Sequence, residues 1–197
     1  MVQSRGLGDV YKRQYYDQEG RGTFERDGGG VLITQAIHTL DIMLLLCGPV
    51  KEVHGMVHTS SFHQLEAEDF SGALLNFESG ARGTLMASTT HFPGHKEEII
   101  LNCSEATVNI SGADLKVFYR NGKIERLETD SQTGSGSDPM DFSYTWHANV
   151  IEQFWTQFTK NQQIEISAES ALPVQQLIDA IVTVSYTHLT LPTTLTV

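Results

Sequence analysis

The stretch from residue 28 to residue 48 reads GGGVLITQAIHTLDIMLLLCG, and it decides how the rest of the chain is interpreted. Its apolar run is too long for a strand, so we predict a helix over residues 31–47. Gly48 and Pro49 follow, and a glycine and then a proline are typical of a helix end. The three glycines are not a dinucleotide fingerprint, because they lack the G-x-G-x-x-G order and follow no predicted strand.

Thr34, His38 and Asp41 form a polar stripe on this predicted helix, spread over about 60° of its circumference. An imidazole can give or take a proton near neutral pH. A carboxylate one turn away can orient the ring, and a hydroxyl one turn before it can bind a substrate hydroxyl. The alternative is structural: a histidine and an aspartate one turn apart often pair, and Leu45 on the same face would be part of the core.

The composition indicates one globular domain and excludes several classes of partner. The chain has 197 residues, 40% of them hydrophobic, and a formal net charge of −11. Its 13 Lys and Arg residues are scattered, which argues against a nucleic-acid or anionic-membrane partner. The two cysteines, Cys47 and Cys103, form no CxxC motif, so we expect reduced thiols and a cytoplasmic protein.

The hydropathy pattern predicts an α+β fold. Residues 50–128 consist of short alternating runs, with turn signals ESG at 78–80 and NG at 121–122, and predict a meander of six or seven antiparallel strands. Residues 147–158 and 167–181 show helical spacing. We therefore expect an open, predominantly antiparallel sheet with helices packed on one face.

The two ends of the chain share no pattern with the rest. Residues 1–14 and 182–197 resemble translated sequencing-adapter DNA, so we expect them to be non-native scars. The expected domain is then 15–181.

Several other candidate residues favour structural roles. Glu68 and Asp69 alternate faces at the start of a strand, and we expect one of them to point at a helix end or an arginine. Trp146 and Trp155 are interpreted as core aromatics, and His147 as a capping or packing residue. The remaining histidines lack the carboxylates or cysteines of a zinc site, so no metal is expected: His54, His58, His63, His91 and His95.

Several motifs, in order, resemble the substrate domain of the glucose–fructose oxidoreductase and inositol dehydrogenase family (Gfo/Idh/MocA). They are GRGTFERDGGGVLITQAIHTLDIMLLLCGPV at 20–50, EAEDFSGALLNFESGARGTLMASTTHFPG at 66–94, HANVIEQFWTQF at 147–158 and SAESALPVQQLIDAI at 167–181. The resemblance implies the C-terminal domain of a two-domain, nicotinamide-dependent oxidoreductase. The Rossmann domain, which in this family binds NAD or NADP and carries a catalytic lysine, is not in this sequence.

The resemblance also assigns roles to residues. His38 matches the histidine of the family's Asp-x-x-x-His pair and would be the catalytic residue, handling the proton of a substrate hydroxyl while hydride passes to or from the nicotinamide. Thr34 stands where the family has the aspartate, and it cannot serve as a carboxylate. Asp41 and Arg21 match further family positions. We expect Thr34, Gln35, Asp41 and Arg21 to contact substrate; for Arg21, near the inter-domain cleft of the family, the alternatives are contact with the cofactor and packing.

The resulting functional hypothesis is the substrate-binding half of an NAD(P)-dependent dehydrogenase or reductase of a sugar, inositol or related polyol. We expect the fragment itself to be inactive and to form a homo-oligomer through the open sheet face. Two alternatives remain: a non-catalytic carbohydrate-binding relative, which Thr34 favours, and a structural assembly domain.

Overall fold

The computed structural model describes most of the chain. The described residues are 2–3, 16, 20–91, 95–128, 144–164, 167–187 and 191–192. Trp146 is placed within a helix, but its side chain is not described.

The predicted helix over residues 31–47 is confirmed, with one irregularity. A short helix, α2 (Phe24–Asp27), precedes the glycines, and α3 (Ile37–Cys47) forms the main helix. Between them, Leu32–Ala36 form a π-helical turn, η1. Gly48 ends α3 at φ 83°, and its N–H donates to the carbonyl of Leu44. This is the glycine stop that the sequence predicted.

Four strands form one antiparallel sheet in the order β4-β3-β2-β9. They are β2 (Val50–His58), β3 (Phe70–Phe77), β4 (Arg82–Ser88) and the two-residue β9 (Leu191–Pro192). The ESG turn joins β3 to β4, as predicted, and Phe70 opposes Ser88 in their register.

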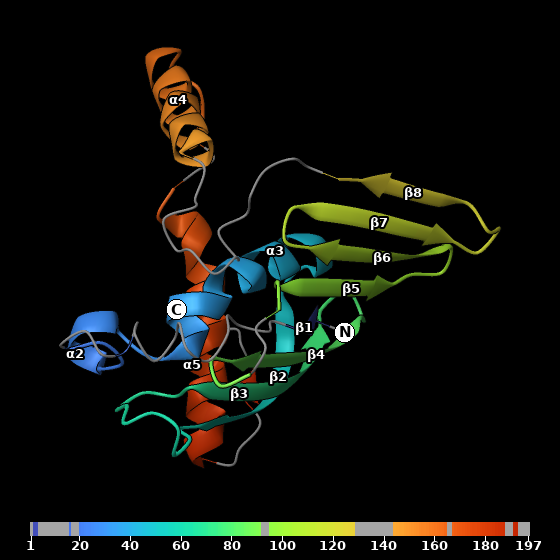
Figure 1. The fold of residues 1–197 in the computed structure, drawn as a ribbon. Helices are drawn as coiled ribbons and strands as arrows, with labels where there is room; N and C mark the ends of the chain where they lie inside the picture. Colours follow the sequence, from blue (N-terminus) through green and yellow to red (C-terminus); the bar gives the residue numbers. More distant parts are fainter. Residues whose placement is uncertain are drawn as a thin grey trace.

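Five strands form a second antiparallel sheet in the order β1-β5-β6-β7-β8. They are β1 (Val2–Gln3), β5 (Glu98–Asn102), β6 (Ala106–Ser111), β7 (Asp114–Tyr119) and β8 (Ile124–Leu127). The predicted meander thus has seven strands, β2 to β8. The antiparallel α+β class is confirmed, but hydrogen bonding stops between β4 and β5 and divides the strands into two sheets (Figure 1).

Helix α5 (Leu172–Thr187) covers the four-stranded sheet at β2, and α3 packs against α5 and approaches β5 of the other sheet. Both helices lie beside the four-stranded sheet in Figure 1. Leu40 of α3, Val53 of β2 and Ile181 of α5 are completely buried. The expected packing of a helix on a sheet face is confirmed for α5.

Residues 24–47 together have the length and apolar composition of a membrane-spanning helix. The glycines interrupt this segment, and Leu32, Leu40 and Met43 within it are completely buried. We therefore interpret it as the core helix of a folded domain.

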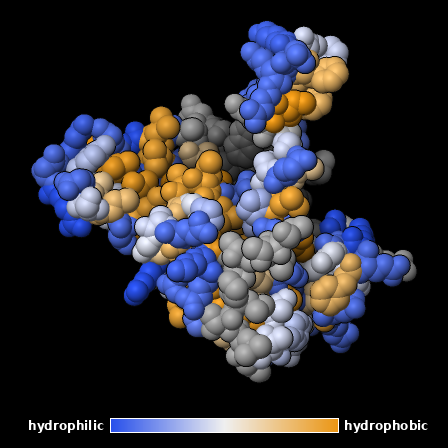
Figure 2. Space-filling view, turned by 180° about the vertical axis from the view of Figure 1, so that it is seen from behind, coloured by the Kyte–Doolittle hydropathy of each residue, from blue (hydrophilic) through white to orange (hydrophobic). Residues whose placement is uncertain are grey.

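Helix α4 (Thr145–Thr159) confirms the second predicted helix but not its burial. It projects away from the rest of the molecule (Figure 1), and Trp155 is 63% exposed. The interpretation of Trp155 as a core aromatic is wrong, because helical spacing shows which residues share a face and not what covers that face. The apolar side chains of α4 are visible at the upper right of Figure 2.

The expected domain boundaries stay a prediction. Most of the two ends lies outside the described residues, apart from β1, which pairs with β5, β9, which pairs with β2, and the last residues of α5, up to Thr187.

Gly55 provides a test of the packing between α5 and β2. A Cβ on Gly55 would lie 3.0 Å from Cγ2 of Ile181 and 3.3 Å from its carbonyl oxygen. We expect Gly55→Val to lower the free energy of unfolding by about 1–3 kcal/mol through overpacking. Urea denaturation measures this change.

Gly72→Val is the matched control, because a Cβ on Gly72 would lie 3.8 Å from its nearest neighbours, within ordinary van der Waals contact. We expect a neutral or stabilising effect there, since valine favours strands. Equal losses in both variants would contradict the proposed close contact.

Candidate active site

The polar stripe on the helix faces outward, away from the core. His38 and Asp41 of α3 are exposed, and Thr34 is half-buried. Leu45, on the same face, is 84% exposed. The interpretation of Leu45 as core is therefore wrong, and the stripe is accessible to a ligand in the described part of the structure.

Thr34 and Gln35 lie in the π-helical turn that precedes α3. The hydroxyl of Thr34 donates to the carbonyl of Gly30 at 2.8 Å, so its single proton is already used. The oxygen can still accept a hydrogen bond. Gln35 is half-buried. Turns of this type are rare and occur often at functional sites.

His38 and Asp41 do not form the pair that their spacing allows. Within the described residues, neither side chain makes a hydrogen bond or an ion pair. The structural alternative required Asp41 to pair with the imidazole of His38. No such partner holds the ring among the described residues. Both ring nitrogens remain available to a ligand.

Arg21 belongs to a different local structure. Its Nη1 lies 3.4 Å from Oδ1 of Asp27, and the other carboxylate oxygen of Asp27 accepts the N–H of Gly22 at 2.7 Å. Helix α2, which begins at Phe24, lies at the left edge of Figure 1, apart from α3. Asp27 thus holds the side chain of Arg21 near the start of α2.

Glu68 is the residue that organises the start of the helix. Its carboxylate accepts the N–H of Gly30 through Oε2 and that of Leu32 through Oε1, both at 3.1 Å. Its backbone carbonyl accepts the N–H of Val31 at 2.8 Å. The expectation that one acid of the pair points at a helix end is confirmed for Glu68.

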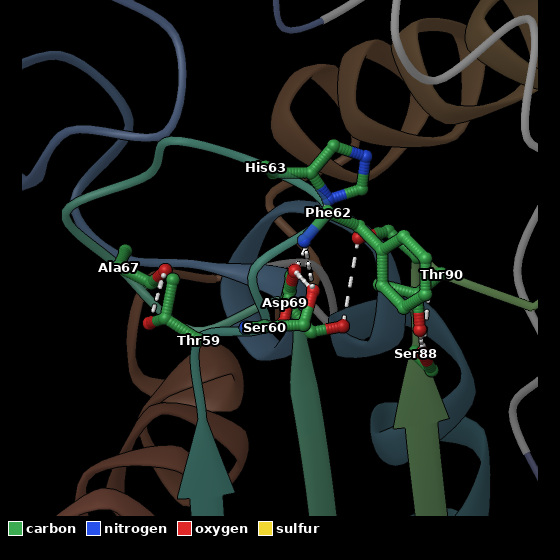
Figure 3. Close-up of polar contacts among 9 residues, drawn as sticks. Thr59, Ser60, Phe62, His63, Ala67, Asp69, Ser88 and Thr90 are labelled. Atoms are coloured by element: carbon green, nitrogen blue, oxygen red, sulfur yellow. Dashed lines mark hydrogen bonds and ion pairs between the residues drawn. The ribbon is translucent and has the colours of Figure 1, made fainter.

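Asp69 is completely buried and fixes the loop between β2 and β3 (Figure 3). Its carboxylate accepts the N–H of Ser60 at 2.8 Å and the hydroxyl of Ser60 at 2.5 Å. Nδ1 of His63 lies 3.1 Å from Oδ2 of Asp69. The serine bonds the carboxylate and not the imidazole, so this is not a nucleophilic triad.

The other histidines lie apart from one another, except His91 and His95, whose ring centroids are 5.2 Å apart. His63 is buried against Asp69, whereas His54 and His58 are exposed on β2. Among the residues that the structure describes, no group of three or more His, Cys, Asp or Glu side chains could hold a metal ion. His147 is exposed at the first turn of α4, so its side chain does not pack in a core.

The glycines do not fit a cofactor phosphate. In a phosphate-binding loop the free N–H groups of a helix start point at the anion. Here those of Gly30, Val31 and Leu32 already bond Glu68, which brings a negative charge to the same place. These three N–H groups are therefore not available to a phosphate.

Comparisons with known proteins agree with this architecture. Residues 1–109 match the model of the GFO/IDH/MocA C-terminal domain. No curated protein sequence matches the chain. Solved structures do: the WlbA dehydrogenase from Bordetella pertussis, crystallised with NADH and UDP-GlcNAcA, is 22% identical, with a TM-score of 0.72 over 98% of this chain and 54% of that one.

Levoglucosan dehydrogenase, in complex with NADH and levoglucosan, is 15% identical, with a TM-score of 0.76 over 98% of this chain and 58% of that one. An oxidoreductase domain protein from Kribbella flavida is also 15% identical, with a TM-score of 0.74 over 98% and 59%. At these identities the likeness establishes the fold. The chain spans little more than half the length of these structures.

The buried carboxylate of Asp69 can be tested by removal. Asp69→Ala would leave the half-buried N–H of Ser60 and the buried ring of His63 without their partner, so we expect a loss of about 3–5 kcal/mol in the free energy of unfolding. Asp41→Ala, on the exposed stripe, is the control and should change stability by less than about 0.5 kcal/mol. Chemical denaturation of both variants decides, and a small effect at Asp69 would contradict the network.

Proposed function

We propose that this chain, which belongs to the GFO/IDH/MocA family, is the substrate-binding part of an NAD(P)-dependent oxidoreductase. The substrate class is a sugar, an inositol or a related polyol or keto-sugar. The observation that carries this proposal is the outward-facing polar stripe on the helix after the glycines, with His38 exposed and unpaired among the described residues.

His38 is the catalytic residue in this proposal. Oxidation of a secondary alcohol requires a group that takes the hydroxyl proton, and reduction of the ketone requires the same group to return it. An imidazole does both near neutral pH. Asp41 lies one turn further along α3, where its carboxylate can accept a hydrogen bond from a substrate hydroxyl or from the ring.

Thr34 and Gln35 are proposed to contact the substrate beside His38. Thr34 can accept a hydrogen bond from a hydroxyl but has no free proton to donate, because its own proton bonds Gly30. The amide of Gln35 can do both. Arg21 pairs with Asp27, and this favours a role in holding the segment before α2 in place.

The cofactor, NAD or NADP, is proposed to bind outside this chain. Two of the structures that share its fold were crystallised with NADH, and more than two fifths of their length has no counterpart here. The backbone N–H of Gly30, at the start of the helix, already donates to the carboxylate of Glu68. By this proposal the chain alone does not catalyse the reaction, because the cofactor cannot be positioned against the substrate.

The surfaces around the stripe support a second domain that covers it. Ile42, Leu45 and Leu46 of α3 are exposed large apolar side chains, and α4 exposes Ile151 and Trp155. Apolar side chains on two separate helices favour burial against another part of a protein. A domain docked over α3 would also close a cleft at His38.

The open sheet faces support a homo-oligomer. Val108 and Val117 oppose each other on one face of the five-stranded sheet and are half-buried, and Leu127 on the same face is 60% exposed. Apolar side chains gather on this side of the molecule in Figure 2. A second copy is proposed to cover this face.

We also propose a cytoplasmic location. Both cysteines are free, Cys103 is exposed, and burial raises the pKa of the Cys47 thiol, which keeps it protonated. Exposed free thiols are typical of reducing compartments.

A non-catalytic carbohydrate-binding relative is the second candidate. Thr34, at the position where the family has an aspartate, is the observation that favours it. Activity of the two-domain protein separates the two candidates.

The decisive experiment restores the genomic sequence upstream of residue 15 and assays NAD and NADP reduction over a panel of polyols. We expect His38→Ala to lower kcat/KM by about 10²- to 10⁴-fold, because the proton acceptor is lost. His54→Ala, an exposed histidine on β2, is the matched control and should leave the rate unchanged. Equal rates for wild type and His38→Ala would exclude the catalytic role, and no activity in the wild type on any polyol would favour the binding relative.

The oligomer is tested with two lysine substitutions, one on each face of β8. Leu127→Lys places a charge on the apolar face, and Ile124→Lys places one on the other face of the same strand. We expect sedimentation velocity to show dissociation for Leu127→Lys but not for Ile124→Lys. A monomeric wild type, or equal behaviour of both variants, would contradict association through this face.

A further inference from the structure

The start of the helix that carries the polar stripe is held by a residue 38 positions away, Glu68. We propose that Glu68 is a positioning residue: it maintains the π-helical turn that places Thr34 and Gln35 on the same face as His38. This inference rests on the proposed function, since it concerns the same substrate-binding stripe.

One residue satisfies three consecutive backbone donors. Gly30 and Leu32 each give their N–H to a separate oxygen of the Glu68 carboxylate, and Val31 gives its N–H to the Glu68 carbonyl. The first donors of a helix have no partner within the helix and must find one elsewhere. Glu68 is 6% exposed, so water does not offer an easy replacement.

The contact leaves no room for adjustment. A Cβ at Gly30 would lie 1.9 Å from the carbonyl oxygen of Glu68 and 2.6 Å from its carboxylate carbon. The next residue, Asp69, is itself fixed by Ser60 and His63. The loop and the start of the helix therefore hold each other in one arrangement.

The π-helical turn is fixed at both ends. On one side of Leu32–Ala36, Glu68 fixes Gly30 to Leu32, and on the other side Leu40 and Met43 fix α3 in the core. A π-helical turn contains one more residue than an α-helical turn. If the anchor at Glu68 were lost, relaxation to an α-helical turn, in which each residue turns through about 100°, would change the orientation of Thr34 and Gln35 relative to His38.

Glu66 on the same loop offers a matched comparison. Its Oε2 accepts the N–H of Phe24 at 3.2 Å, which is also a capping contact with the preceding segment. Glu66 is exposed, however, and its contact lies at the start of α2, before the glycines. A general effect of loosening the loop would appear in both residues, whereas positioning of the stripe would appear in Glu68 alone.

The test compares Glu68→Gln with Glu66→Gln in the two-domain protein and in the 197-residue chain. A glutamine keeps one acceptor oxygen and turns a donor toward the other N–H. In the two-domain protein we expect Glu68→Gln to raise the KM for the polyol about tenfold, while the KM for the cofactor stays unchanged. We expect Glu66→Gln to leave both within about twofold of the wild type, inside the usual scatter of additive effects.

Amide hydrogen exchange of the 197-residue chain gives a readout that does not depend on activity. Faster exchange over residues 30–36 in Glu68→Gln, with β2 and β3 unchanged, is the expected result. Equal exchange and equal KM in the two glutamine variants would overturn the proposal. If His38→Ala keeps full activity, the proposed function fails, while the exchange comparison still decides whether Glu68 holds the turn.

Ser60→Ala supports the test if Glu68→Gln does not fold. It removes one of the bonds that fix the residue beside Glu68 and leaves Glu68 itself intact. A rise in the polyol KM, and in exchange over residues 30–36, is expected in the same direction but smaller. No change in either quantity would overturn the proposal.

Discussion

The buried carboxylate of Glu68 at the start of the helix is the constraint on which the proposed site depends. A helix start leaves several N–H groups without partners, and glycines leave the backbone open to a close approach. Glu68 meets both conditions at once, because its carboxylate reaches Gly30 and Leu32 while its carbonyl reaches Val31. The same contact excludes a phosphate from the glycines. In the proposed function, this helix contacts the substrate and the cofactor binds another part of the protein.

The proposed second domain also explains the exposed apolar side chains of α3. A helix of a complete globular domain buries its apolar side chains on one face and leaves polar ones outside. Here α3 buries Leu40 and Met43, yet it also exposes Ile42 and Leu45 beside His38. Apolar side chains on both faces of a helix indicate contacts on both faces. In the proposed two-domain protein, the second contact is the wall of the substrate cleft opposite the stripe.

The sequence predicted what depends on local patterns. The apolar run and Gly48 predicted α3, the ESG and NG turns predicted two hairpins, and the acidic pair predicted a carboxylate at a helix end. The π-helical turn could not be predicted, because it results from a contact between residues that lie 36 to 38 positions apart. The exposure of Leu45 and Trp155 was also missed. Periodicity shows which residues share a face, and only the folded chain shows whether something covers it.

Thr34 gives the proposed site a chemical preference that the sequence alone did not reveal. A carboxylate at this position could only accept hydrogen bonds, and a free threonine could both donate and accept. Because the Thr34 hydroxyl donates to Gly30, it too can only accept from a ligand. The threonine therefore keeps the acceptor of the family's aspartate and loses its charge. A substrate that donates hydroxyl protons fits this arrangement, so the stripe favours an alcohol over a bare ketone at this position, and recognition there depends on hydrogen bonding without help from a negative charge.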